Sequence, residues 1–406
     1  MQKFLTVLLL AFVTIALAAC SSGEQELGAT DKEIDKKVDV SSVQKGETSG
    51  DSENASNIKS TKNVTRLDAD SLIEASVQVS QTIWPATENA NKPGAVILAP
   101  VDNWQIALAS ADLIHHPNNG PVLFYEDEGI PEFTLQELER LSPTSTMDGI
   151  EVMVMGNADQ KVLDELKDYQ ILQIEGEDPV AFAVDVDKAY ADAAGEIPQG
   201  LIIVSSEEEA KLYSLIASNW IAHMPEPILY VTKDEIPDAT IKALELRNKA
   251  ANIYMLGPES VISADIEESL KDYGMVTRIG GETPVEVSVE FAKFKDEKTG
   301  FGWGINEPGH GFGFISTEDA GFAVAGAPFA HLGKHAPLIW LENGEVSDTT
   351  HEFLGELQPK FTDDPTVGPY NHGFIVGSGT SITIQTQGMI DQMLEITSSD
   401  GGGHGH

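Results

Sequence analysis

Short apolar runs alternate with amphipathic stretches along most of this chain, and the alternation occurs three times in succession. Each round contains a continuous apolar run beside a glycine, and an alanine-rich amphipathic stretch follows that run. Continuous apolar runs predict strands that are buried on both faces, and amphipathic stretches predict helices that cover them. The three opening strands are predicted at 94–100, 200–206 and 311–317.

Each repeat continues in the same order, with a second strand that begins at a proline, a helix, a third strand that ends at a glycine, and a last helix. The prolines are Pro121, Pro227 and Pro337, which lie 106 and 110 residues apart. A fourth strand is predicted in the first two repeats, at 170–176 and 276–281. A further helix opens each repeat, and these helices are predicted at 70–83, 180–194 and 285–294.

Strands that alternate with helices predict a parallel sheet with helices on both faces. The repeat length of roughly 105–120 residues exceeds that of solenoid repeats and matches a small domain that could hold its own core. We therefore predict an α/β fold of three tandem small domains, each a parallel sheet flanked by helices. Their predicted ranges are 63–178, 179–283 and 284–397.

The repeats resemble the type 2 cell wall-binding repeats of exported proteins from Gram-positive bacteria. Residues 278–281 (Arg-Ile-Gly-Gly) are similar to the opening of the family pattern, and 102–111 are similar to its first helix, with Trp104 in the aromatic position. Residues 325–330 are similar to the continuation of that helix. The resemblance extends over 63–396 with the three units in register. It implies three repeats around a pseudo-threefold axis that bind an anionic wall polymer non-covalently.

The first residues have the layout of a secretory signal. Lys3 precedes an apolar run, and Leu-Ala-Ala-Cys at 17–20 ends it. This layout resembles the leaders of bacterial lipoproteins, so we predict a signal peptide at 1–19 and lipidation of Cys20, the only cysteine of the chain. Residues 20–62 are polar and predict a disordered tether. A short flexible tail is predicted at 398–406.

The charge of the chain restricts its partners. It carries 65 acidic and 25 basic Lys or Arg residues, which gives a formal net charge of −40. Such a protein repels nucleic acid, so we predict no nucleic-acid partner. It also repels an anionic wall polymer, unless divalent cations such as calcium or a local basic patch intervene. We therefore predict no cofactor other than divalent cations such as calcium.

Ligands of open α/β sheets bind beyond the carboxyl ends of the strands. The loops predicted there are polar and acidic, which suits sugars or divalent cations. The same residue types are common helix caps, so a capping role stays open beside the binding role. The candidate ligand-binding residues are Asp102, Asn103, Trp104, Ser205, Ser206, Ser316 and Thr317.

Two further segments bear candidate chemistry. Residues 300–313 alternate glycine with aromatic residues, and such a loop can lay its rings against sugars or pack them on the third repeat. His331 and His335 would share one face of a helix, as zinc ligands can. Other candidate histidines are His115, His116 and His310. The chain lacks a His-Glu-x-x-His motif and a Gly-x-Ser-x-Gly elbow. We predict no metal site and no catalytic residue.

These observations predict a non-enzymatic lipoprotein at the extracytoplasmic face of the cell membrane. Its repeats would bind wall glycopolymer or peptidoglycan, and the lipid on Cys20 would hold it to the membrane, so that it bridges membrane and wall. The alternative is a lipoprotein that binds a solute or a metal in the envelope. An envelope hydrolase is a third hypothesis, which the lack of a catalytic motif disfavours.

Overall fold

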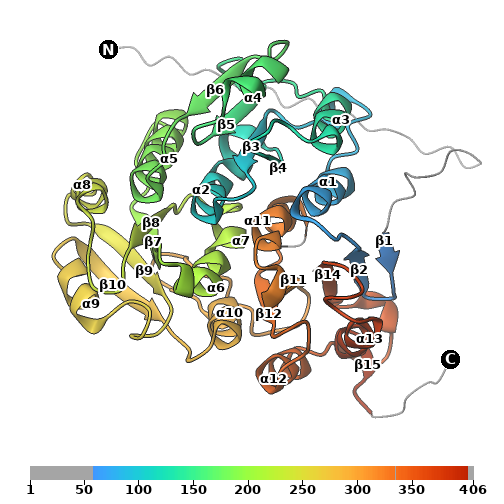
Figure 1. The fold of residues 1–406 in the computed structure, drawn as a ribbon. Helices are drawn as coiled ribbons and strands as arrows, with labels where there is room; N and C mark the ends of the chain where they lie inside the picture. Colours follow the sequence, from blue (N-terminus) through green and yellow to red (C-terminus); the bar gives the residue numbers. More distant parts are fainter. Residues whose placement is uncertain (1–57, 334, 401–406) are drawn as a thin grey trace, which may run out of the picture. The chain divides into compact units, whose positions relative to one another are not determined.

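Three parallel sheets, one from each repeat, organise the computed structural model of the chain, which describes residues 58–333 and 335–400 (Figure 1). All of these residues belong to one compact unit, Ala55–His406. The sheets are flanked by helices, as the sequence predicted. The first sheet has the order β4-β3-β5-β6. Its strands are β3 (Val96–Pro100), β4 (Val122–Tyr125), β5 (Val152–Met155) and β6 (Ile171–Ile174).

The second sheet has the same order, β8-β7-β9-β10, and all its strands are parallel. The third sheet begins in the same way, as β12-β11-β14. The strands of the second sheet are β7 (Gly200–Ser205), β8 (Ile228–Val231), β9 (Ala251–Leu256) and β10 (Gly274–Ile279). Those of the third are β11 (Gly311–Ser316), β12 (Leu338–Leu341) and β14 (His372–Val376).

The third sheet takes its fourth strand from the other end of the chain. β2 (Val64–Leu67) pairs in parallel with β14, and β1 (Ile58–Ser60) adds an antiparallel edge strand. The range 63–178 predicted for the first repeat thus includes a strand of the third sheet. The predicted tether, 20–62, includes β1, so its last residues are part of the fold. Cys20, the signal peptide at 1–19 and tail residues 401–406 lie outside the described residues.

The helices follow the predicted order. The opening helices are α1 (Leu72–Ile83), α5 (Pro179–Ala194) and α10 (Pro284–Lys293). The helices between the second and third strands are α3 (Glu132–Leu141), α8 (Asp238–Glu245) and α12 (Asp348–Glu356). The last helices are α4 (Gln160–Glu165), α9 (Ala264–Leu270) and α13 (Ile384–Met393). Among the described residues, no helix has both the length and the apolar character needed to cross a membrane.

The stretches predicted as helices after the first strands are instead broken into short helical segments. The first consists of α2 (Trp104–Ser110), η2 (Ala111–Leu113) and the π turn η3 (Ile114–Asn118). The second consists of η4 (Glu208–Ala210), α6 (Lys211–Ser214), η5 (Leu215–Ala217) and α7 (Ser218–Ile221). The third consists of η6 (Thr317–Asp319), α11 (Phe322–Gly326) and the π turn η7 (Phe329–Gly333). These stretches pack against one another between the sheets, where α7 contacts both η2 and α11.

Each sheet buries its two faces in different cores. In β3, Val96 and Leu98 belong to a core of the first repeat, whereas Ile97 and Ala99 belong to a core shared by all three repeats. β7 divides its side chains in the same way between a core of the second repeat and the shared core. The repeats therefore hold only one face of each sheet by themselves, and the other face requires the neighbouring repeats.

The contacts between repeats run in a closed cycle. The Tyr230 hydroxyl of β8 donates a hydrogen bond of 2.8 Å to the Gln105 carbonyl of α2. The Trp340 ring of β12 donates a bond of 2.9 Å from Nε1 to the Leu212 carbonyl of α6. Phe124 has the equivalent place in β4, which contacts α11 of the third repeat. The second strand of each repeat thus lies against the helical stretch that follows the first strand of another repeat.

Arg66 anchors β2 in the third sheet. It is 1% exposed and donates to the carbonyls of Gly377, Ser378 and Thr383 and to the side chain of Gln387. Arg278 occupies the same place in β10 and makes the same kind of bonds, to the carbonyls of Gly257, Ile262 and Ser263 and to the Glu267 carboxylate. In β6 the place is taken by Gln173, which donates to the Gly156 carbonyl.

Replacement of Arg66 by leucine should lower the free energy of unfolding by about 2–5 kcal/mol, because buried carbonyls lose their donors. Gln173→Leu, at the equivalent place, removes one such bond and should cost about 1 kcal/mol. Lys62→Ala is the control, because it breaks only an exposed ion pair with Glu395. Urea unfolding of the three variants measures these differences. Equal stability of the Arg66 and Lys62 variants would contradict this role of Arg66.

Candidate functional site

The predicted ligand-binding residues at the strand ends make local turns and helix caps. The Asn103 side chain accepts a hydrogen bond of 3.0 Å from the Ile106 amide and caps α2. The hydroxyls of Ser205 and Ser316 each accept a bond of 3.2 Å, from the amides of Glu207 and Glu318 respectively. Both serines are buried. The capping role that the sequence left open is therefore present.

Two of the other predicted residues, Trp104 and Ser206, join the first and second repeats. The Trp104 ring donates from Nε1 to the Glu208 carboxylate over 2.6 Å, and Gln105 donates to the Ser206 carbonyl over 3.1 Å. Thr317 stays within the third repeat, where its hydroxyl accepts from the Asn343 amide at 2.9 Å.

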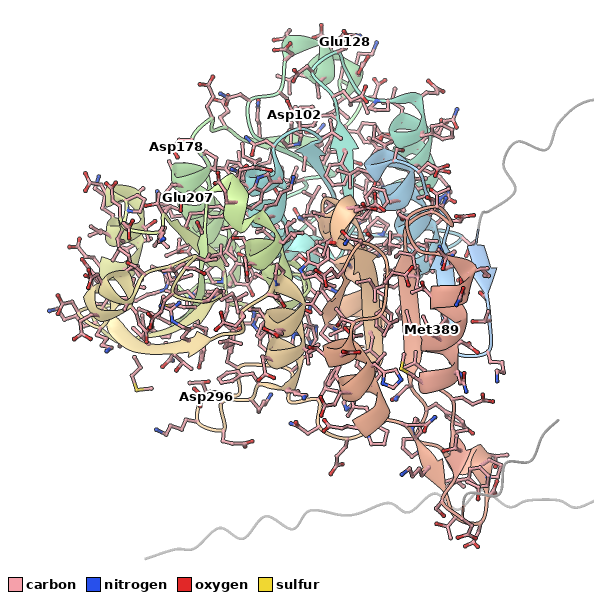
Figure 2. All side chains as sticks on the ribbon, turned by 60° about the horizontal axis from the view of Figure 1, so that its bottom comes forward. Asp102, Glu128, Asp178, Glu207, Asp296 and Met389 are labelled. Atoms are coloured by element: carbon pink, nitrogen blue, oxygen red, sulfur yellow. The ribbon has the colours of Figure 1, made fainter. Side chains whose placement is uncertain are left out.

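Only Asp102 of the seven candidates is exposed. Figure 2 shows Asp102 and Glu128, which follow β3 and β4, near the same end of the first repeat. Binding of a ligand by these loops remains a prediction.

A cavity of about 540 Å³ lies where the second and third repeats meet. Its lining includes Trp220, Trp303, Lys295, His223, His310 and His335. The predicted glycine-rich loop supplies several of these residues and forms one wall. The cavity combines aromatic faces with imidazole and ammonium groups, which is the mixture that sugar-binding sites use.

The loop at 300–313 holds Phe301 and Trp303 in different ways. Phe301 is buried and stacks on Tyr254 of the second repeat, with the ring centres 3.6 Å apart. Trp303 is only partly buried and stands edge-on to Trp220. Gly302 lies between them with a φ of +95°, and a Cβ there would lie 2.4 Å from the Phe294 carbonyl, so the turn requires glycine. The loop thus packs Phe301 on both the second and the third repeat, because Phe291 and Phe294 of the third repeat also contact its ring, and it presents Trp303 at the cavity.

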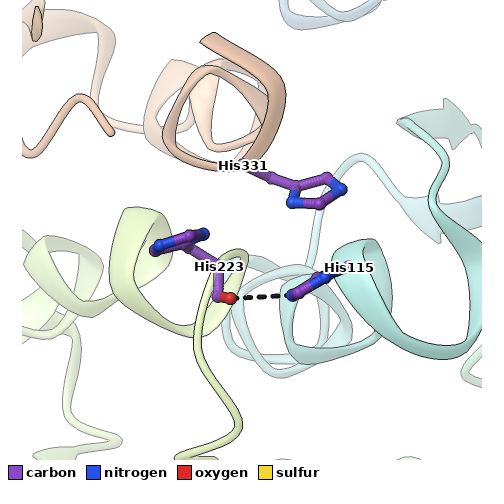
Figure 3. A group of neighbouring side chains, drawn as sticks. All are labelled: His115, His223 and His331. Carbon is purple, nitrogen blue, oxygen red and sulfur yellow. Dashed lines mark hydrogen bonds between the residues drawn. The ribbon is translucent and has the colours of Figure 1, made fainter. Parts of the chain in front are cut away.

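Three histidines meet beside this cavity, one from each repeat (Figure 3). His115 belongs to η3, His223 follows α7, and His331 belongs to η7. One ring nitrogen from each lies within 4.8 Å of the others. Among the described residues, this is the one group of three or more His, Cys, Asp or Glu side chains at such distances.

The rings of this histidine group are held in contact. The rings of His115 and His331 have their centres 4.1 Å apart, and His115 and His223 stack at 6.2 Å. Burial and the neighbouring imidazoles lower the pKa of His223 to about 4, and the same two causes lower that of His331 to about 4. Both rings are therefore neutral near pH 7, and their nitrogen lone pairs are available.

The sequence spacing indicated other histidine pairings. It paired His331 with His335, which lies outside η7 and places its ring 4.4 Å from that of His223. His116, the neighbour of His115, turns instead toward Tyr190. His223 was missed, although a signal exists: His115, His223 and His331 are each 108 residues apart, so they occupy one equivalent position in the three repeats.

A buried carboxylate lies in the same segment as His115. Both oxygens of Asp112 are buried and have no hydrogen-bond partner among the described residues. Burial raises the pKa of Asp112 well above its usual value, and the nearby carboxylates of Asp187 and Glu226 raise it further. The positive charge of Arg247 lowers the pKa of Asp112, but Arg247 already donates hydrogen bonds of 2.8 and 2.9 Å to Asp187.

Comparisons with known proteins bear on the fold. Cwp6 from Clostridium difficile superposes with a TM-score of 0.66 at 18% identity, over 86% of this chain and 50% of that one. Cwp8 from the same organism gives 0.63 at 17% identity, over 82% and 52%. The chain thus spans about half the length of these solved structures. They share its fold. No protein-family model and no curated protein matches the chain.

Replacement of Asp112 by asparagine should stabilise the protein increasingly as the pH rises. The folded-state pKa of Asp112 lies above the unfolded value, so its stabilising contribution is present at low pH and is lost as the pH rises. The free energy of unfolding of the variant should equal that of the parent at about pH 4 and exceed it by about 1–3 kcal/mol at about pH 8. Chemical unfolding across this range measures the difference.

Asp102→Asn is the matched control for this series, because Asp102 is exposed and its variant should follow the parent at every pH. A difference between the Asp112 variant and the parent that stays constant or shrinks as the pH rises would contradict the assignment.

Proposed function

We propose that this protein is a non-enzymatic envelope lipoprotein that binds wall glycopolymer or peptidoglycan through its three α/β repeats. The fold supports this proposal, because the three α/β repeats, the third completed by β2, superpose on the cell wall proteins Cwp6 and Cwp8 over most of the chain. The lipid on Cys20 would hold the protein at the extracytoplasmic face of the membrane. It would then bridge membrane and wall.

The cavity beside Trp303 is the most suitable place for a glycan on the described residues. A partly exposed indole ring can stack on the apolar face of a sugar, and the adjacent polar groups can receive its hydroxyls. Lys295 also lines the cavity and adds a positive charge for an anionic group of the polymer. The strand-end loops contribute less, because most of their candidate side chains bind within the fold.

The net charge of −40 opposes an anionic polymer. Exposed carboxylates such as Glu126, Asp127 and Glu128 can share a calcium ion with phosphate or carboxylate groups of the wall. We therefore propose that calcium strengthens wall binding. The alternative function is that of an envelope protein that binds a solute or a metal. The histidine group favours metal binding within this alternative.

Sedimentation with purified cell walls tests the proposed function. A soluble form without residues 1–20 should sediment with the walls, more so with calcium, and should stay in solution when the walls are stripped of anionic polymer. Trp303→Ala should weaken binding about two- to tenfold, because a stacked ring contributes roughly 0.5–1.5 kcal/mol. The measurement is the bound fraction against wall concentration.

Phe133→Ala is the matched control, because Phe133 is 60% exposed on α3 of the first repeat and does not line the cavity. Its binding should equal that of the parent. Absence of sedimentation under every condition would overturn wall binding. Equal binding by the Trp303 variant would overturn the cavity as the binding place.

A further inference from the structure

We propose that His115, His223 and His331 bind one transition-metal ion of the zinc class at the point where the three repeats meet. Each ligand comes from the same position of a different repeat. The site therefore exists only when all three repeats are assembled. It adjoins the wall-binding cavity, which His223 also lines, but it uses imidazole nitrogens to bind a metal ion and does not depend on the proposed function.

The distances between the nitrogens suit a metal after a small adjustment. Zinc binds imidazole nitrogen at about 2.0–2.1 Å, which places neighbouring ligand nitrogens of a tetrahedral site about 3.3 Å apart. The three nitrogens here lie within 4.8 Å of one another. Each ring therefore has to move by less than about 1 Å, which side-chain rotation provides.

Hydrogen bonds orient two of the rings as metal ligands. His115 Nδ1 lies 2.8 Å from the His223 carbonyl, an oxygen that can only accept, so Nδ1 carries the proton and Nε2 keeps its lone pair (Figure 3). His331 Nε2 lies 3.1 Å from Asn119 Oδ1, which likewise leaves the lone pair on Nδ1. Metal-binding histidines are held in this way by an oxygen acceptor on their second nitrogen.

The third ring provides an independent observation. His223 Nδ1 is buried and has no hydrogen-bond partner among the described residues. A buried ring nitrogen without a partner is unfavourable, and a metal ion would relieve that cost.

The donor set decides the class of metal. Three imidazoles favour zinc, nickel, copper or iron over calcium or magnesium, which take oxygen ligands. Three protein ligands leave a fourth position for water or for His335, whose ring lies beside that of His223. Such an ion would join the repeats at their centre, in addition to the cycle of contacts between them. It is therefore a different ion from the calcium invoked for wall binding.

Titration with Zn²⁺ and Co²⁺ tests the site in the protein without residues 1–20. His404 and His406 are replaced by alanine in every sample, because tail histidines can bind metal loosely. Calorimetry should show one Zn²⁺ per chain with a dissociation constant of about 10 μM or tighter. Bound Co²⁺ should give the strong visible absorption of a four-coordinate ion, and Zn²⁺ should abolish it.

Variants distinguish this site from other histidines. His223→Gln keeps a polar side chain of similar reach and should weaken Zn²⁺ binding at least about tenfold, and Asn119→Ala should weaken it by about tenfold through the orientation of His331. His351→Ala is the control, because His351 is exposed on α12 and should leave binding unchanged. Circular dichroism establishes that each variant is folded.

Two outcomes would overturn the proposal. One is the absence of Zn²⁺ binding at about millimolar metal by the protein without tail histidines. The other is a His223 variant that is folded and binds Zn²⁺ as tightly as the His351 variant does. Both outcomes leave the wall-binding test unaffected, because that test uses calcium and cell walls.

Discussion

The burial of one face of each sheet against the other repeats is the constraint on which the rest of the structure depends. Ile97 of β3, Ile202 of β7 and Ile315 of β11 all lie in the same central core. A sheet with two apolar faces exposes one of them if its repeat stands alone, and that exposure is costly. The three repeats therefore form a single cooperative body rather than independent domains on a string, consistent with one compact unit.

The same constraint determines how the ends of the chain are used. A third sheet without a fourth strand would leave the outer edge of β14 unpaired, and β2 covers this edge. Arg66 then ties β2 to the loop that follows β14, as Arg278 ties β10 to the loop that follows β9. The predicted tether thus leads directly into a strand that completes the fold. Any pull on the N-terminal segment would act on the third repeat.

The centre of the molecule combines tight packing with unsatisfied polar groups. Asp112, His116 and His223 all have buried atoms without partners among the described residues, and all lie on the turns between the sheets. A core made only for stability would fill this place with apolar side chains. The broken helical turns have a direct effect here, because the π turns η3 and η7 bring His115 and His331 to the point where they meet His223.

The sequence by itself determined the alternation of strands and helices, the threefold repetition and the parallel sheets, because these follow from local apolar periodicity. It located the residues of the strand-end loops but could not choose between capping and binding. The Val-Thr-Arg pattern shared by β2 and β10 was present in the chain, yet its meaning needed a partner strand more than 300 residues away. Only the tertiary structure decided which sheet includes β2, which side chain Trp303 packs against, and which histidines meet. The physical reason is that these depend on how separate repeats pack, and local periodicity holds no information about contacts between distant segments.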